Sequence, residues 1–457
     1  MADSNIEVLK IGGGILRNKD CFERVINVVK DKSNSNKKIV IVLSALYGVT
    51  DYLIESSKKC ILHESEIQKA IFELKNMHYQ YLDFIKTPSI QHETKAKLNQ
   101  KIDTLEKILY GVNYLNELSL KSKDYIQSFG ERLSPIILNA ILLDNKINSK
   151  FLDAIDAGII CKGNYENAQI DLRTTEKNLL KLKNELNSTV ILLPGYYGVD
   201  LENNTKTFGR GGTDYSAGII ANIFDAKLEI IKDVSGFMSA DPKLIKTAVQ
   251  LPFISYSEAE ELGYLGAKIL HPKTIAPLRA KNLIAEIKDL FNYQKTGTII
   301  CGEDKTPAKI KSITNSSVSI ITIKSDDMVD TPGFAGELFT LIGKKEISVD
   351  LISTSETSIS FSVKPIAIKS CIEQLKKLNA NYNIEVKEKL SMIGIVGKGL
   401  IHNIGIAGKI FSVLGINGIN IYLISQGSSE LNLSFVINEK DVKKAIQEIH
   451  NQIILNQ

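Results

Sequence analysis

The sequence predicts an α/β fold in which an open, mostly parallel sheet between helices is followed by two ferredoxin-like units. Short β-branched runs alternate with longer helical patterns over the first 300 residues, which is typical of a sheet covered by helices. After Thr296-Gly297-Thr298, short strands and glycines take over, and two stretches match each other at a fixed offset of 72 residues. We therefore expect domains at residues 1–300, 318–390 and 391–457, with residues 305–317 as a further candidate strand of the last one.

The first domain is expected to contain several strands and one long helical insertion. From Tyr52 to Leu120 the sequence is rich in Lys and Glu, with apolar residues three or four positions apart and only Pro88 as a breaker. This pattern predicts helices with a solvated face. The strand-like runs are Ile6–Ile11, Lys38–Leu43, Val190–Leu193, Leu228–Lys232 and Leu283–Lys288.

The two repeats are copies of one small unit. Each copy reads as strand, helix, strand, strand, helix, strand, and its first helix follows a glycine turn at Gly333 or Gly405. This order is ferredoxin-like. The matching positions are Gly333, Ala335, Gly336, Phe339, Gly343, Ile347, Leu351, Ile352, Ser353 and Ser362 against Gly405, Ala407, Gly408, Phe411, Gly415, Ile419, Leu423, Ile424, Ser425 and Ser434.

The composition is that of a globular protein without a polyanionic partner. Of 457 residues, 44% are hydrophobic and 24% charged, and the net charge of +4 is spread without basic blocks, so no nucleic-acid surface is predicted. The amino terminus lacks a signal-peptide pattern, and no stretch approaches the roughly 20 apolar residues of a membrane span. The five cysteines are scattered singly. We expect a cytoplasmic location and no membrane partner.

A glycine-rich segment after the first strand is a candidate phosphate site. Neither G-x-x-x-x-G-K-[ST] nor G-x-G-x-x-G occurs, so phosphates must be held in another way. In Lys10-Ile11-Gly12-Gly13-Gly14, glycine N–H groups can converge on anionic oxygens, and Lys10 can neutralise a transferring phosphoryl group. A simple tight turn is the alternative.

The segment Phe208-Gly209-Arg210-Gly211-Gly212-Thr213-Asp214-Tyr215-Ser216-Ala217 combines an arginine, several glycines and the start of a helix. Arg210 suits bidentate capture of a substrate carboxylate, and Thr213 can cap a helix whose amino terminus attracts anions. Asp214 can orient Lys10 or take part in metal binding. A glycine turn with an Asp cap is the alternative.

Further charged residues lie in three other segments. Lys232-Asp233-Val234-Ser235-Gly236-Phe237-Met238-Ser239-Ala240-Asp241-Pro242 follows an apolar strand, where open α/β sheets bind ligands. Lys268 precedes His271-Pro272 and offers a cation for polyphosphate, and Glu131 places a carboxylate at a helix opening. Taken singly, the first of these segments is as often a plain loop. As isolated residues, Lys268 is more often a surface lysine and Glu131 more often a salt-bridge partner.

Taken together and in this order, these motifs resemble the amino-acid kinase superfamily and, within it, the aspartokinase family, with the two repeats similar to paired ACT domains. The strongest elements are Gly209–Ala217, Lys232–Pro242, Gly266–Pro272 and Val349–Glu356. The length and the helical insertion look like the longer, lysine-sensitive monofunctional members. The resemblance implies phosphorylation of the side-chain carboxylate of L-aspartate by ATP and Mg²⁺, the first step toward lysine, threonine and methionine.

The resemblance also implies roles for single residues. Lys10 and Asp214 are the expected catalytic pair, and Mg²⁺ is expected to arrive on the nucleotide without protein ligands of its own. The substrate is expected at Thr50, Glu131, Arg210 and Thr213, with Glu131 on its amino group and Arg210 on its carboxylate. ATP is expected at Lys10, Gly12, Gly13, Ser44, Lys232, Asp233, Lys243 and Lys268. The allosteric candidates are Phe334, Val349, Asp350, Ser355 and Glu356.

The two repeats differ where an effector would be bound. Asp350 and Glu356 of the first copy match Tyr422 and Ser428 of the second, so a cationic amino group is favoured by the first copy only. Lysine is the expected inhibitor, although an exposed strand-end role for Asp350 is the alternative. The resemblance implies a homodimer or a dimer of dimers joined through the repeats.

Several departures from the family pattern leave alternatives open. Gly14 and Ile15 stand where two hydroxyl residues are usual, Met238 where a tyrosine is common, and Lys243 where an arginine is frequent. A related kinase for another carboxylate such as glutamate, or a non-catalytic amino-acid sensor, are the rivals. Lysine against threonine as effector, dimer against tetramer, and the pathway branch stay open.

Overall fold

The computed structural model describes residues 5–267, 269–302, 309–325, 328, 332–378, 382–400, 403–427 and 431–456. The chain divides into two compact units. The first contains Met1–Gly236, Pro252–Tyr256 and Leu270–Asp304, and the second contains Phe237–Leu251, Ser257–Ile269 and Lys305–Gln457. None of the described helices is long and apolar enough to cross a membrane.

The first unit is built on an eight-stranded sheet, as the alternating pattern predicted. The strand order is β10-β12-β11-β9-β1-β2-β6-β3, and every pair is parallel except β11 with β12. Its strands are β1 (Ile6–Ile11), β2 (Lys38–Leu43), β3 (Ser149–Phe151), β6 (Val190–Pro194), β9 (Lys227–Lys232), β10 (Phe253–Ser255), β11 (Ala285–Asp289) and β12 (Thr298–Cys301). Two small ribbons accompany it: β4 (Cys161–Lys162) with β5 (Gln169–Ile170), and β7 (Tyr197–Val199) with β8 (Thr205–Thr207).

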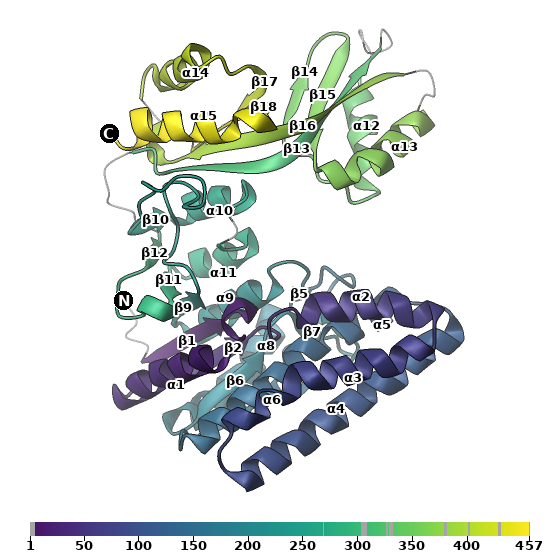
Figure 1. Cartoon of the computed structure of the whole chain (residues 1–457), viewed down its shortest axis with the longest axis vertical. Coiled ribbons are helices and arrows are strands. Elements are labelled where there is room, and N and C mark those ends of the chain that lie inside the picture. Colours follow the sequence, from purple (N-terminus) through teal and green to yellow (C-terminus); the bar gives the residue numbers. More distant parts are fainter. Residues whose placement is uncertain are drawn as a thin grey trace. The chain divides into compact units, whose positions relative to one another are not determined.

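Helices account for most of the remaining first unit (Figure 1). The predicted insertion is a group of helices in which α4 begins at Pro88, so this proline starts a helix instead of interrupting one. The helices are α1 (Lys19–Asn34), α2 (Val49–Leu62), α3 (Ser65–Tyr79), α4 (Pro88–Leu115), α5 (Leu120–Gln127), α6 (Phe129–Asp144), α7 (Ala154–Ala157), α8 (Leu172–Leu179), α9 (Gly212–Phe224) and α11 (Ile275–Ala280).

Strand alternation decides which side chains of β1 enter the core. Leu9 and Ile11 belong to one buried apolar cluster with Val25 of α1 and Leu133 of α6. Because successive side chains of a strand point to opposite faces, Lys10 points away from this cluster. Helix α9 packs on β1, β2 and β9, and Lys10 finds its partner there.

The second unit contains one continuous sheet of both repeats, in the order β14-β15-β13-β16-β18-β17. Two long strands, β13 (Ser312–Lys324) and β16 (Asn383–Val396), run antiparallel through both repeats (Figure 1). The other elements are α10 (Tyr256–Tyr264, of which Tyr256 belongs to the first unit), α12 (Phe334–Gly343), β14 (Ile352–Thr354), β15 (Ser358–Val363), α13 (Ile368–Leu378), α14 (Ile406–Ile416), β17 (Ile421–Gln426), β18 (Asn432–Asn438) and α15 (Val442–Ile449), with a π-helical turn at His450–Ile454.

The predicted element order is correct for the first repeat and wrong at the end of the second. Among the described residues, α15 leads into the π-helical turn and no final strand follows. Its place beside β16 is taken by the first half of β13, where Ser312 pairs with Val396 and Val318 with Leu390. A ferredoxin-like unit needs a partner for this strand, and β13 provides it from before the first repeat.

Candidate active site

The candidate site of the first unit lies where three neighbouring parallel strands end. β9, β1 and β2 are adjacent in the sheet and run in the same direction. Parallel strands end at the same edge of a sheet, so the segments that follow Ile11, Leu43 and Lys232 come together. The predicted motifs of the first unit gather at this edge.

Lys10 and Asp214 form a buried ion pair at its centre. Lys10 Nζ lies 2.7 Å from Asp214 Oδ1, and the side chains are only 7% and 11% exposed. Burial alone would raise the pKa of Asp214, but the positive charges of Lys10 and Lys232 hold it below its usual value. Asp214 is therefore an anion at neutral pH, held between two cations.

Lys232 ends β9, and Asp233 follows it directly. Burial, aided by the charge of Lys10, lowers the pKa of Lys232, while Asp214 and Asp233 oppose the shift. Asp233 has a 44% exposed side chain that lies near Gly14 and within 3.8 Å of Arg17 Nη1. This part of the site is thus rich in charge and partly open to solvent.

The glycine segment after β1 packs against the segment after β2. A Cβ at Gly12 would lie 3.2 Å from Lys10 Nζ, and one at Gly13 would lie 2.7 Å from the Ala45 carbonyl oxygen. Ser44 donates its N–H to the Ile11 carbonyl at 3.1 Å. The two predicted phosphate segments are therefore neighbours.

Glu131 lies in the first turn of α6 and is almost fully buried, with no hydrogen-bond partner for Oε2. The neighbouring Gly130 allows this approach, because a Cβ there would lie 2.6 Å from Ala45 Cβ and 3.6 Å from Thr50 Oγ1. Burial raises the pKa of Glu131 to about 8, against backbone hydrogen bonds from Ala45 and Glu131 and the charge of Lys10. A positive charge that approaches such a buried carboxyl favours its ionised form, so Glu131 is suited to bind a cationic group.

The amino end of α9 carries the predicted substrate residues. Arg210 is exposed and makes no ion pair with any residue that the structure describes. The predicted capping role of Thr213 is wrong: Gly211, with φ of +71°, is the N-cap, and Thr213 lies buried inside the first turn. Only glycine fits at position 211, since a Cβ would collide with the His271 side chain.

Two predicted nucleotide residues are not placed with the others. Lys268 lies outside the described residues. Lys243 is an exposed residue of the second unit, where its N–H donates to Asp241 Oδ1 at 2.9 Å. Their roles stay predictions.

The allosteric candidates belong to the first repeat of the second unit. Tyr264 of α10 donates its hydroxyl to Asp350 Oδ1 at 3.1 Å, and burial raises the pKa of Asp350. Phe334 and Val349 are half-buried, whereas Ser355 and Glu356 are exposed. Asp350 is thus a partly shielded carboxylate and not a freely exposed strand-end residue.

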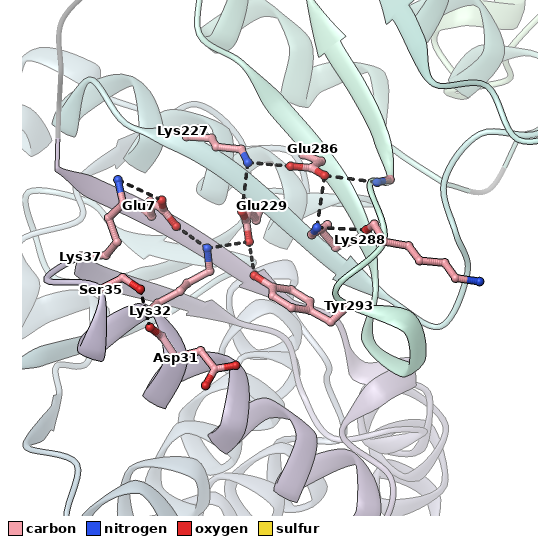
Figure 2. A network of polar contacts seen from close by, with 12 residues as sticks. Glu7, Asp31, Lys32, Ser35, Lys37, Lys227, Glu229, Glu286, Lys288 and Tyr293 are labelled. Carbon is pink, nitrogen blue, oxygen red and sulfur yellow. Dashed lines mark hydrogen bonds and ion pairs between the residues drawn. The ribbon is translucent and has the colours of Figure 1, made fainter.

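A second charged cluster lies nearer the amino-terminal ends of the same strands (Figure 2). Lys32 of α1 bridges glutamates of β1 and β9, with Nζ 3.0 Å from Glu229 Oε2, and the tyrosine after β11 donates to Glu229 as well. The lysines and glutamates of this cluster pair with one another, so we interpret the cluster as stabilising the fold and not as a ligand site. Its members are Glu7, Lys32, Lys37, Lys227, Glu229, Glu286, Lys288 and Tyr293.

Three residues without a predicted role lie close to residues of these sites: Arg17, His271 and Tyr264. His271 occurs in a quoted motif but had no role, and here its pKa is lowered by burial and by Lys273 and Arg210. Arg17 and Tyr264 lie outside any motif, so nothing local could reveal them. Within the described part of the chain, no group of three or more His, Cys, Asp or Glu side chains could hold a metal ion.

Comparison with known proteins finds similar sequences over nearly the whole chain. A model of the amino acid kinase family matches residues 5–289, and a model of the ACT domain matches residues 321–378 and 393–453. Aspartokinase 1, chloroplastic, of Arabidopsis thaliana is 30% identical over 97% of this chain and 79% of its own length. The bifunctional aspartokinase/homoserine dehydrogenase of Buchnera aphidicola is 31% identical over 99% of this chain, which spans only 57% of that relative.

Two solved structures of one protein share the fold over the whole chain. E. coli aspartokinase III in complex with aspartate and ADP (R-state) has a TM-score of 0.83 at 25% identity, covering 98% of this chain and 99% of that one. The same protein in complex with lysine and aspartate (T-state) also has a TM-score of 0.83, with 98% and 100% covered.

Proposed function

The chain belongs to the amino acid kinase family and, within it, to the aspartokinases with paired ACT domains; on this premise we propose that Lys10 and Asp214 are the centre of an ATP-dependent aspartate kinase site under feedback control by lysine. The product is an acyl phosphate, 4-phospho-L-aspartate. The observation that carries the proposal is the buried Lys10–Asp214 ion pair, with Lys232 beside it, at the carboxyl edge of the sheet.

The reaction needs alignment and charge neutralisation but no general base. The acceptor is the side-chain carboxylate of aspartate, which is already ionised at neutral pH because its reference pKa is about 3.9. Its oxygen attacks the terminal phosphorus of ATP, and ADP leaves with the electron pair of the broken bond. Lys10 and Lys232 stabilise the charge on the transferring phosphoryl oxygens, and Asp214 holds Lys10 in place.

The glycine segments supply main-chain donors for the phosphates. Gly12, Gly13 and Ser44 lie on two neighbouring strand exits. Mg²⁺ is proposed to arrive on the nucleotide, where it would neutralise phosphate charge. The carboxylate that suits it is Asp233, which is partly exposed and not committed to a buried ion pair.

Substrate binding follows from the charges around the acceptor. The buried Glu131 carboxylate is proposed to bind the α-ammonium group of aspartate, and the exposed Arg210 its α-carboxylate. Thr50 lies beside Gly130, the neighbour of Glu131, and Thr213 lies in the first turn of α9, close in sequence to Arg210. This leaves the side-chain carboxylate free to face Lys10.

Lysine is proposed as the inhibitor, bound by the first repeat. Asp350 is a half-buried carboxylate that the second repeat replaces with Tyr422, and Glu356 adds a second negative charge nearby in sequence. Phe334, Val349 and Ser355 are proposed to complete the pocket. Threonine as a further effector is not favoured by any residue described.

Self-association is proposed to occur through the repeats, as a homodimer or a dimer of dimers. Edge strand β14 is exposed along its whole length, and Ile352 within it is 46% exposed. Exposed edge strands of this kind pair readily with another chain. A cytoplasmic location stays a prediction from the sequence.

The test is a hydroxylamine trap of the acyl phosphate. Purified full-length chain is incubated with ATP, Mg²⁺ and either aspartate or glutamate, and hydroxamate is measured. Hydroxamate from aspartate alone supports the proposal. Hydroxamate mainly from glutamate would show that the acceptor is glutamate and not aspartate. Hydroxamate from neither amino acid would favour a non-catalytic amino-acid sensor.

A further inference from the structure

The proposed substrate arginine lies in the short segment between β8 and the amino end of α9. β8 has only three residues and pairs only with β7 among the described strands. Its last residue, Thr207, is separated from Arg210 by only two residues. The segment is also held by α9 and by backbone hydrogen bonds from Ala168 to Thr207 and from Phe208 to Tyr196. Since a two-stranded ribbon is marginally stable alone, side chains that anchor β8 help to set the position of Arg210.

Asp124 of α5 is the first anchor. It is fully buried, and Oδ2 accepts the N–H groups of Thr207 at 2.8 Å and Glu166 at 2.9 Å. Oδ1 accepts the Thr207 hydroxyl at 2.8 Å. A buried carboxylate that takes three hydrogen bonds from two segments fixes both, because leaving any of those donors unpaired is costly.

Arg132 of α6 is the second anchor. Its Nη2 donates to Thr205 Oγ1 at 2.9 Å and its Nη1 donates to Asp153 at 2.7 Å, while Nε donates to Ser128 Oγ. The guanidinium also lies 4.6 Å from the centre of the Tyr197 ring in β7. Both ends of β8 are therefore tied to the same pair of helices.

These helices also carry the other half of the proposed substrate clamp. Only Ser128 separates α5 from α6, and Glu131 is the direct neighbour of Arg132. Adjacent residues of a helix point in different directions, so Arg132 donates to Thr205 of β8 while the Glu131 carboxyl accepts a backbone hydrogen bond from Ala45. The anchors thus connect the ammonium-binding carboxylate and the carboxylate-binding arginine through a few buried hydrogen bonds.

We propose that Asp124 is a positioning residue for the substrate, which sets the distance between Glu131 and Arg210 by holding Thr207. An α-amino acid carries its ammonium and carboxylate on one carbon, so the two groups that bind them must keep one short separation. The inference rests on the proposed function, since it assigns Glu131 and Arg210 to aspartate. Asp124 itself does not touch the reacting atoms.

The test compares three variants in the full-length chain, with KM measured separately for aspartate and ATP. Asp124→Ala removes all three hydrogen bonds and is expected to raise the KM for aspartate roughly tenfold, with the KM for ATP within about twofold. Thr207→Val removes only the hydroxyl and is expected to have a smaller effect in the same direction. Asp124→Asn keeps an oxygen for both N–H groups and is expected to restore the KM to within about threefold.

Glu229→Gln is the matched control, because Glu229 is an equally buried carboxylate in the cluster of Figure 2. It is expected to lower the melting temperature without changing the ratio of the two KM values. Hydrogen exchange at the Thr207 amide should become faster in Asp124→Ala only. Equal changes in both KM values, an unchanged KM for aspartate, or failure of Asp124→Asn to rescue would overturn the inference.

Failure of the proposed function gives a different result. If the wild-type chain makes no hydroxamate from aspartate, both the proposed function and this inference are refuted. If the wild type is active and Asp124→Ala alters the KM values for aspartate and ATP alike, only this inference is refuted.

Discussion

Lys10 Nζ and Asp214 Oδ1 lie 2.7 Å apart, although Lys10 belongs to β1 and Asp214 to the first turn of α9, about 200 residues later in the sequence. Both side chains are buried, so neither charge is stable without the other. An anionic phosphoryl group that approaches Lys10 would find a cation already oriented by Asp214. The pair therefore serves both the stability of the fold and the proposed chemistry.

Replacing Lys10 should separate these two roles. Lys10→Met is expected to lower kcat in the hydroxamate assay by about 10²- to 10³-fold, because one charge that stabilises the transition state is lost. Lys32→Met removes a lysine of the cluster in Figure 2 and should change kcat little while lowering the melting temperature. A near-normal kcat of Lys10→Met would show that Lys10 does not take part in the reaction.

The binding of aspartate should depend on pH through Glu131. Its pKa of about 8 means that the free enzyme carries a neutral carboxyl below this pH, which cannot pair with an ammonium group. The KM for aspartate is expected to rise about fivefold from pH 8 to pH 7, while the KM for ATP stays level. In Glu131→Gln the KM for aspartate should be higher than in the wild type and should not change with pH. A wild-type KM that is constant from pH 8.5 to 6.5 would contradict this role.

Inhibition by lysine should require the Asp350 carboxylate. Asp350→Asn is expected to weaken inhibition at least tenfold with the uninhibited kcat unchanged, because the charge that attracts the ammonium group is lost. Tyr264→Phe removes the neighbouring hydroxyl donor but keeps the carboxylate, so inhibition should persist. Both are measured as lysine titrations of the hydroxamate assay, and full inhibition of Asp350→Asn would refute the assignment.

Stability should fall in mild acid because of His78. This histidine of α3 is fully buried, and burial lowers its pKa to about 4 against the bond between Nδ1 and the Leu74 carbonyl. The unfolded chain takes up a proton near pH 6.5 and the folded chain only near pH 4, so stability is lost as pH falls between these values. The total loss is about 3 kcal/mol.

Denaturant titrations at pH 7, 6 and 5 measure this loss. His78→Leu should flatten the pH dependence of the free energy of unfolding, whereas His92→Leu, at an exposed position of α4, should not. Equal slopes for wild type and His78→Leu would show that other groups are responsible.

Much of the first unit could be predicted because the deciding interactions are local. The runs Ile6–Ile11 and Lys38–Leu43 are strands with those bounds. The second reads as a nearly continuous apolar run, as strands buried on both faces do, whereas the first also carries Glu7 and Lys10. The strand expected at Leu283 starts two residues later, at Ala285. Thr213 did not become a cap, because α9 starts two residues earlier than Thr213 would require, with Gly211 as the N-cap. The close approach of His271 that requires glycine at position 211 is not visible in any local pattern.

The sequence by itself determined the order of strands and helices, the presence of two repeats, and the segments that carry glycines and charges. These properties depend on residues a few positions apart, through periodicity and turn chemistry. The tertiary structure alone decided that Asp124 holds Thr207 and that Glu131 is buried with a raised pKa. Burial and long-range hydrogen bonds depend on which surfaces meet, and that is settled only when the whole chain packs.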